Sequence, residues 1–156
     1  MYDRILVPLD DSPTAQRVLA EAAQLAKLAG ACVRLLHIVD PVAHTRGFER
    51  PQTYLQDILP AVEQAGAALL EQARAQLVAQ GVQAETALVQ SLDARVAQIV
   101  VEQAGQWGAD LIVLGTHGRR GVARMLLGSD AEQIARTAPV PVLLVRLPQG
   151  SAEGGG

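Results

Sequence analysis

A glycine-rich segment with basic side chains follows an apolar run in the second half of the chain. Residues 114–133, LGTHGRRGVARMLLGSDAEQ, include four glycines, three arginines and one histidine. A glycine has no Cβ, so its backbone can adopt positive φ and approach a ligand closely. An arginine can donate two hydrogen bonds at once to a phosphate. These residue types favour a loop that holds an anion.

The end of the same segment carries the signals of a helix start. Ser129 is followed three residues later by Glu132, which is the spacing of a capping box. The free backbone N–H groups and the positive dipole end of such a helix attract phosphates. However, glycines and a serine cap also describe an ordinary turn between a strand and a helix. The composition alone therefore leaves both interpretations open.

A second group of polar residues follows the first apolar run, where Asp10 and Asp11 stand side by side. In an open parallel sheet, ligands bind beyond the carboxyl ends of the strands, where the strand order reverses. The two aspartates and the glycine-rich segment can share one crevice only if the first and fourth strands are neighbours.

Five apolar runs predict strands that are covered on both faces, because their apolar residues are continuous and do not alternate. The expected strands span 4–9, 32–39, 82–89, 111–115 and 141–147. Helical patterns lie between them. Strands that alternate with helices predict right-handed crossovers and a parallel α/β sheet.

The first two expected helices have recognisable ends. Ser12 is a natural N-cap for the first, with Pro13 as its first helical residue and Gly30 directly after its end. The second spans about 57–80, and Gly81 terminates it. Its expected buried stripe consists of five apolar residues: Val62, Ala65, Leu69, Ala73 and Leu77.

A third helix follows the apolar pattern from Val96 to Ala104, with Asp93 as its expected N-cap, and a fourth begins near Ser129. The stretch 40–56 between the second strand and the second helix has no clean period and is longer than most connectors. We interpret it as a lid or a protein-binding loop, with a disordered insertion as the alternative.

Composition limits the class of protein. The 156 residues suffice for one domain, expected over 1–147, and the tail 148–156 is expected to be disordered. A net charge of −3 and 3% aromatic residues argue against nucleic-acid binding. No apolar run reaches the ~18 residues of a membrane span, and the first residues do not read as a secretion signal, so we expect a cytoplasmic protein.

Two side chains with possible chemistry are more simply structural. Cys32 is the only cysteine, which excludes an intrachain disulfide. We interpret it as a small core residue, with a nucleophile as the less favoured alternative. His37 ends an apolar strand and reads as a partly buried histidine with a satisfied ring. His117, by contrast, is expected to touch a ligand through its backbone, with a role as general base as the alternative.

The spacing of the glycines is more specific than their number. Gly115 and Gly118 are separated by two residues, and nine further residues lead to Gly128 and Ser129. Here the sequence resembles the universal stress protein family, whose nucleotide-binding members carry GxxG, nine residues and then GS or GT. The resemblance spans about residues 2–147. It includes YDRILVPLDDSPTA, LLHIVDP, GADLIVLGTHGRRG and APVPVLLV.

The resemblance implies a fold, a ligand and a partner. The fold is an open, doubly wound, Rossmann-like sheet of five parallel strands in the order 3-2-1-4-5, which makes the first and fourth strands neighbours. The ligand is ATP, and the partner is a second copy bound across the last strand, Val140–Leu147.

The ATP contacts that the resemblance implies fall into three groups. The adenosine half is expected to rest on Pro8, Leu9, Asp10 and Ile38. The ribose and phosphates are expected to lie over Leu114, Gly115, His117 and Gly118. Apart from the resemblance, the charges of Arg119, Arg120 and Arg124 are expected within reach of phosphate oxygens. The phosphates are expected to meet the backbone N–H groups and hydroxyl of Gly128, Ser129, Asp130 and Ala131.

Two places depart from the family pattern. Asp130 stands where relatives commonly have a small or apolar residue, and its carboxylate suits a helix N-terminus but repels a triphosphate. A divalent cation such as Mg²⁺ between them, a solvent-facing Asp130 and weak binding remain alternatives. The stretch QSLDARVA at 90–97 lacks the glycine and proline that many relatives carry before the third helix.

Binding is favoured over turnover. The chain has no GxxxxGK[ST] phosphate loop, no HxGH signature and no SGGxDS loop. We therefore expect a nucleotide-dependent stress-response switch or sensor. The alternatives are an enzyme, as a slow ATPase or a nucleotidyl transferase, and an interaction module that binds no nucleotide.

Overall fold

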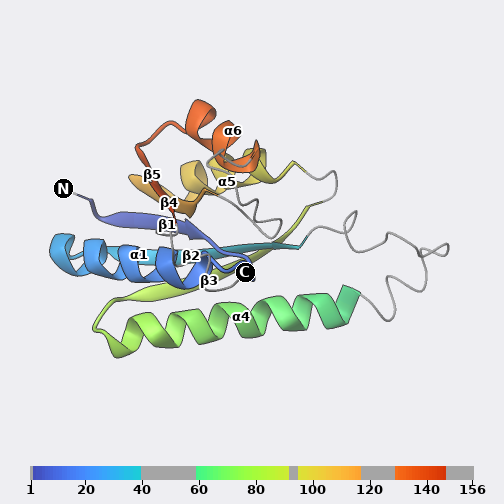
Figure 1. Cartoon of the computed structure of the whole chain (residues 1–156), viewed down its shortest axis with the longest axis horizontal. Coiled ribbons are helices and arrows are strands. Elements are labelled where there is room, and N and C mark those ends of the chain that lie inside the picture. Colours follow the sequence, from blue (N-terminus) through green and yellow to red (C-terminus); the bar gives the residue numbers. More distant parts are fainter. Residues whose placement is uncertain (1, 40–58, 92–94, 117–128, 147–156) are drawn as a thin grey trace.

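The computed structural model describes residues 2–39, 59–91, 95–116 and 129–146 (Figure 1). Strands and helices alternate along the chain, as the hydrophobic pattern predicts. In chain order the elements are β1 (Arg4–Pro8), α1 (Ala15–Ala29), β2 (Cys32–Val39), α4 (Leu59–Ala79), β3 (Ala84–Gln90), α5 (Val96–Trp107), β4 (Leu111–Gly115), α6 (Ser129–Thr137) and β5 (Val142–Val145).

All five strands form one parallel sheet in the order β3-β2-β1-β4-β5, which confirms the expected topology. β1 lies at the centre. It pairs on one side with β2, where Val7 stands opposite Leu35, and on the other with β4, where Leu6 stands opposite Ile112. After β3 the chain crosses to β4 on the other side of β1, so the strand order reverses at β1.

Two apolar layers hold the helices on the sheet. α1 and α4 cover one face and α5 and α6 the other (Figure 1). Successive residues of β1 serve opposite layers: Ile5 and Val7 pack with α1 and α4, whereas Leu6 packs with α5 and α6. Because both faces are buried, the strands are apolar throughout, which is the pattern seen in the sequence.

The start of α1 differs from the prediction. The helix begins at Ala15 with Thr14 at the N-cap, so Ser12 is not the cap and Pro13 lies in the preceding turn. The reason is local hydrogen bonding. The Asp10 carboxylate accepts the Ser12 N–H at 2.9 Å, and the Ala15 N–H donates to the Ser12 carbonyl at 3.1 Å. These bonds close a separate turn before the helical pattern can begin.

The ends of α1 and α4 were predicted correctly. Gly30 has φ of 69° and its N–H donates to the Ala26 carbonyl, so it is a left-handed C-cap. Gly81 has φ of 84° and follows the end of α4. The buried stripe of α4 is rotated from the expected one in its first half, where Gly66 and Leu70 are buried instead of Ala65 and Leu69.

The start of α5 also departs from expectation. Arg95 occupies the N-cap position, and Asp93, the expected cap, lies outside the described residues. Ser91 ends the preceding segment fully buried, and its N–H donates to the Val39 carbonyl at 2.7 Å. Among the buried side chains of the described ranges, the Ser91 hydroxyl is the polar group without a hydrogen-bond partner. Nothing in the structure explains that hydroxyl.

The amino ends of β1 and β4 are tied together by one carboxylate. Asp110 accepts the N–H of Asp3 at 2.8 Å with one oxygen and the N–H of Arg4 at 3.0 Å with the other. The Asp110 N–H in turn donates to the Arg4 carbonyl at 2.9 Å. The Arg4 guanidinium donates to the Trp107 carbonyl. These hydrogen bonds lie at the amino ends of the strands, whereas the predicted ligand site lies at their carboxyl ends.

Cys32 is half-buried at the start of β2. Burial, followed by the nearby Glu85 carboxylate, raises the pKa of the thiol above its ordinary 9.0. A raised pKa leaves little thiolate near neutral pH, which agrees with a structural role and not with a nucleophile.

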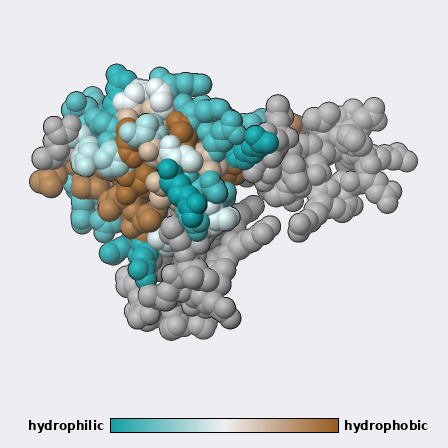
Figure 2. Space-filling view, turned by 90° about the horizontal axis from the view of Figure 1, so that it is seen from above, coloured by the Kyte–Doolittle hydropathy of each residue, from teal (hydrophilic) through white to brown (hydrophobic). Residues whose placement is uncertain are grey.

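The surface combines polar and apolar areas. Seen from above, an apolar area is bordered by hydrophilic residues (Figure 2). Four large apolar side chains of the described ranges are well exposed: Leu28, Val78, Leu88 and Leu143. No helix in those ranges is long and apolar enough to cross a membrane.

Candidate functional site

The carboxyl ends of β1 and β4 lie next to each other. The two strands pair directly, with Ile5 opposite Leu111 and Leu6 opposite Ile112, so both run toward the same edge of the sheet. β1 ends at Pro8 and β4 at Gly115. The condition under which Asp10 and the glycine-rich segment share one crevice is therefore met.

The chain after β1 is held in a defined shape. The Leu9 N–H donates to the Leu36 carbonyl at 2.7 Å, and the Leu9 carbonyl lies 2.9 Å from Nδ1 of His37. Asp10 follows, half-buried, with Oδ1 bonded to the Ser12 N–H. The second carboxylate oxygen of Asp10 has no hydrogen bond to the described residues. It is the acceptor that this turn presents at the strand ends.

The side chains of two expected adenosine and ribose contacts face the core. Leu114 is 5% exposed and packs in the layer under α5 and α6, and Ile38 is half-buried against the same layer. A ligand at the sheet edge would therefore meet these residues through their backbone groups. For Ile38, the family resemblance implies such a backbone contact with the adenine.

Gly115 is needed for packing. A Cβ at this position would lie 2.9 Å from Cγ2 of Thr14 and 3.4 Å from Cγ2 of Val18, both at the start of α1. Its φ is not among the positive values of the described glycines. Gly115 therefore does not use the freedom of φ that glycine allows; its missing side chain lets α1 approach β4.

The N-terminus of α6 presents polar groups. Ser129 and Asp130 are exposed at the first two positions, whereas Ala131 is buried with Ile134 against β4. The expected capping box does not form. Ser129 already belongs to the helix, and the Glu132 carboxylate lies 3.2 Å from the Arg136 guanidinium one turn later. The first backbone N–H groups of α6 are therefore not capped by Glu132.

Part of the predicted site lies outside the described residues. This holds for His117, Gly118, Arg119 and Gly128, and for the loop 40–56. The structure brings six of the remaining members together at the carboxyl ends of the neighbouring strands β2, β1 and β4: Pro8, Leu9, Asp10, Ile38, Leu114 and Gly115. The other three, Ser129, Asp130 and Ala131, begin α6, the helix that follows β4 in the chain.

The donor set fits a nucleotide better than a bare metal. Within the described ranges no group of three or more His, Cys, Asp and Glu side chains could hold a metal ion. The groups present are a carboxylate oxygen that can accept from a ribose hydroxyl, and a helix N-terminus that can donate to phosphates.

Sequence reasoning missed one structural role at this site and anticipated another. It missed that Thr14, at the start of α1, requires glycine at position 115. That role leaves no signal in the sequence, because it depends on how α1 crosses β4. The prediction that His37 is partly buried with a satisfied ring is confirmed, and its partner is the Leu9 carbonyl.

Comparisons with known proteins agree with this arrangement. The sequence profile of the Universal stress protein family matches residues 1–146. A universal stress protein of Thermus aquaticus, encoded in the 3′ region of a QAH/OAS sulfhydrylase gene, is 37% identical over 148 residues. The match covers 94% of this chain and all of that protein.

Solved structures show the same fold. A universal stress family protein from Burkholderia pseudomallei superposes with a TM-score of 0.73 at 33% identity, over 92% of this chain and 96% of that one. A universal stress protein in complex with cAMP has a TM-score of 0.66 at 27% identity, over 92% and 97% of the two chains. One from Archaeoglobus fulgidus in complex with dAMP reaches 0.62 at 26% identity, with the same coverage.

Proposed function

The chain belongs to the universal stress protein family, and we propose that it binds ATP at the carboxyl ends of β1 and β4 and acts in the cytoplasm as a nucleotide-dependent stress-response switch. The observation that carries the proposal is the direct pairing of β1 with β4. It brings the end of β1, which leads into Asp10, beside the end of β4, and so supports a shared site there. Two structural neighbours are complexes with adenine mononucleotides.

The adenosine half of the site is built from the turn after β1. The free oxygen of Asp10 accepts a ribose hydroxyl, because the other oxygen is held by the Ser12 N–H. The backbone of Ile38, at the end of β2, meets the base. Pro8 and Leu9 form the floor, since Leu9 is fixed to β2 through its N–H.

The phosphate half is built from α6 and the residues before it. Backbone N–H groups of the first turn and the Ser129 hydroxyl donate to phosphate oxygens, and the helix dipole adds attraction. The spacing of Gly115, Gly118 and Gly128 gives the phosphates a path free of side chains. The positively charged Arg119 side chain pairs with phosphate oxygens, and Mg²⁺ binds together with the triphosphate.

We propose binding without rapid turnover. Hydrolysis of a triphosphate needs a positioned water and strong charge neutralisation at the γ-phosphate. Asp10 lies at the adenosine half, and Asp130 is exposed at the start of α6. Steady ATP consumption above that of a variant that cannot bind would favour the slow ATPase instead.

Calorimetric titration of the purified protein tests the proposal. ATP with Mg²⁺ is expected to give a saturable heat, and GTP is expected to bind at least tenfold more weakly because the Ile38 backbone reads the adenine edge; a tenfold change corresponds to about 1.4 kcal/mol. Replacing Asp130 with asparagine is expected to strengthen ATP binding about twofold to fivefold without Mg²⁺, because an exposed charge near the phosphates repels weakly.

Two results would contradict the proposal. The first is the absence of saturable heat at millimolar ATP in the wild-type protein. The second is equal binding of ATP and GTP, which would leave a phosphate site but no adenine site. Weaker binding of ATP by the Asp130→Asn variant only when Mg²⁺ is present would assign Asp130 to the cation.

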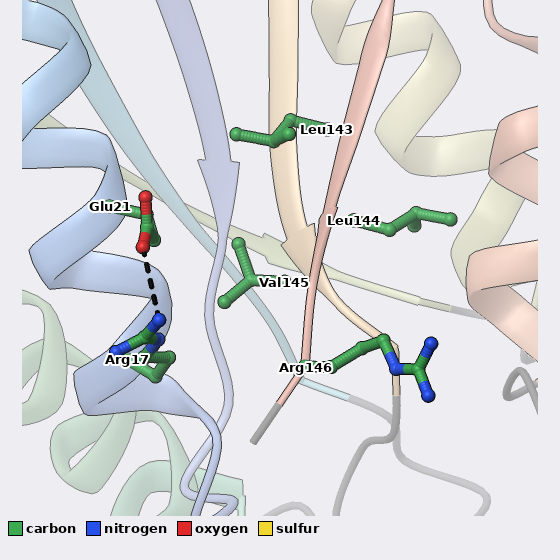
Figure 3. A pocket seen from close by; sticks show the side chains of 6 residues that line it. All are labelled: Arg17, Glu21, Leu143, Leu144, Val145 and Arg146. Carbon is green, nitrogen blue, oxygen red and sulfur yellow. Dashed lines mark ion pairs between the residues drawn. The ribbon is translucent and has the colours of Figure 1, made fainter. Parts of the chain in front are cut away.

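We further propose that a second copy binds along β5. This strand is an edge of the sheet, so its outer backbone groups have no strand partner in the described ranges. A shallow groove of about 240 Å³ runs beside it, lined by Arg17 and Glu21 of α1 and by residues 143–146 (Figure 3). Leu143 and Val145 point toward α1, whereas Leu144 and Arg146 point away from it (Figure 3).

Light scattering coupled to size-exclusion chromatography tests the dimer. We expect twice the mass of the chain for the wild-type protein. Replacing Leu143, which is 36% exposed, with aspartate should shift the protein to monomer, because a carboxylate is costly to bury in the proposed interface. A wild-type protein that is monomeric at all concentrations would contradict this interface.

A further inference from the structure

We propose that helix α4 sets the shape of the nucleotide site through His37, with Gly66 as the point of contact. The inference rests on the proposed function and adds two positioning residues to it. Neither His37 nor Gly66 belongs to the expected ligand contacts. His37 lies on β2 and Gly66 on α4, which runs below the sheet on the side of α1 (Figure 1).

The first step is the pair of contacts that hold the Leu9 backbone. Its N–H donates to the Leu36 carbonyl at 2.7 Å and its carbonyl lies 2.9 Å from Nδ1 of His37. A carbonyl can only accept, so Nδ1 carries the proton in this contact. Both backbone groups of Leu9 are thus held by β2, and the peptide that leads into Asp10 has a fixed orientation.

The second step is the support behind the imidazole ring. A Cβ on Gly66 would lie 2.7 Å from Cδ2 and 3.2 Å from Nε2 of His37, and 3.1 Å from Cδ1 of Leu88. The helix backbone therefore rests directly on the ring. Gly66 is buried in the middle of α4, where glycine is unfavourable for the helix, so the absence of its side chain has a packing reason.

The third step connects the ring to the ligand. His37 precedes Ile38, whose backbone meets the base, and holds Leu9, which precedes Asp10. A displacement of the His37 ring is therefore expected to move both the Ile38 backbone and the turn that carries Asp10. The α6 end of the site does not contact His37 or Gly66, because α6 packs on the opposite face of the sheet.

Variants of His37 test the hydrogen bond. His37→Leu removes the donor and is expected to weaken adenosine binding about fivefold to tenfold, the effect of losing one orienting hydrogen bond. Inorganic triphosphate, which uses only the α6 end, is expected to bind within about twofold of wild type, as for independent sites. His37→Asn keeps a donor near the position of Nδ1 and is expected to restore most of the adenosine affinity.

Alanine variants of two helix glycines test the contact between α4 and His37. Gly66→Ala is expected to weaken adenosine binding to a similar degree, because the new Cβ displaces the ring. Gly105→Ala in α5 is the matched control, since nothing lies within 4 Å of its added Cβ. The control is expected to raise Tm by about 2 to 4 °C, through the better helix propensity of alanine, and to leave adenosine binding unchanged.

The outcomes are distinct. If the wild-type protein binds neither adenosine nor ATP, the proposed function itself is wrong. If it binds both and His37→Leu and Gly66→Ala bind adenosine as tightly as Gly105→Ala, the positioning role is wrong while the proposed function stands. If adenosine and triphosphate weaken equally in both variants, the contact supports the fold in general, and the inference is again wrong.

Discussion

Replacing Gly118 with valine is expected to abolish most ATP binding while leaving the fold intact. Gly118 is the second glycine of the pattern that ends in Gly128 and Ser129, and the phosphates pass over it in the proposed site. Forcing a side chain into a tight contact costs about 1 to 3 kcal/mol. Each ~1.4 kcal/mol is a tenfold change in Kd, so ATP affinity should fall by about 5-fold to 150-fold in calorimetry.

Gly121→Val is the matched control for this prediction. Gly121 lies in the same glycine-rich segment but outside the spaced pattern. The control should keep ATP affinity close to that of the wild-type protein, and both variants should unfold at similar temperatures. Equal loss in the two variants would mean that the segment tolerates no added bulk anywhere, and the assignment of Gly118 to the phosphate path would fail.

The largest expected loss of stability comes from Asp110→Ala. Its carboxylate accepts two backbone N–H groups, from Asp3 and Arg4, and so closes the amino ends of β1 and β4. Hydrogen bonds to a charged group contribute about 1.5 to 3 kcal/mol each. Because this site is partly open to solvent, we expect the free energy of unfolding to fall by about 2 to 4 kcal/mol in urea denaturation.

Asp110→Asn refines that prediction. Asparagine keeps one acceptor oxygen and replaces the other with a donor, so it should lose at least half of what alanine loses. ATP affinity should stay unchanged in both folded variants, because Asp110 lies at the opposite edge of the sheet from Asp10. A loss of stability below about 0.5 kcal/mol in Asp110→Ala, typical of an uninvolved surface position, would show that these hydrogen bonds of Asp110 are not needed.

The fold was largely predictable from the sequence because strands buried on both faces leave a simple signal. The runs at 32–39 and 111–115 match β2 and β4 without a shift. The run predicted at 141–147 is longer than β5, which spans Val142–Val145; Leu147 lies outside the described residues. The sequence pattern reports apolar burial, whereas the strand bounds depend on which backbone groups find a partner.

Details set by hydrogen bonds between neighbours were harder to predict. Ser12 has the residue type and position of an N-cap, but it lies in a turn in which its N–H donates to the Asp10 carboxylate and its carbonyl accepts the Ala15 N–H. The spacing of Ser129 and Glu132 fits a capping box, yet Glu132 pairs with Arg136 one turn later. In both cases a motif of the right types competes with an equally local alternative, and spacing alone does not decide between them.

The site was predictable where it depended on topology and not where it depended on packing. The order of the strands follows from the family resemblance, and it brings Asp10 close to the end of β4. The role of Gly115 could not be read in the same way. Its glycine allows Thr14 to approach, a contact between elements about a hundred residues apart in the chain.

A crystal structure of the protein grown with ATP and Mg²⁺ tests the central claim most directly. We expect the adenosine beside Asp10 and Ile38, a ribose hydroxyl bonded to the free Asp10 oxygen, and the phosphates at the first turn of α6. A well-ordered structure with no nucleotide at millimolar ATP, or with the nucleotide bound away from the ends of β1 and β4, would contradict it.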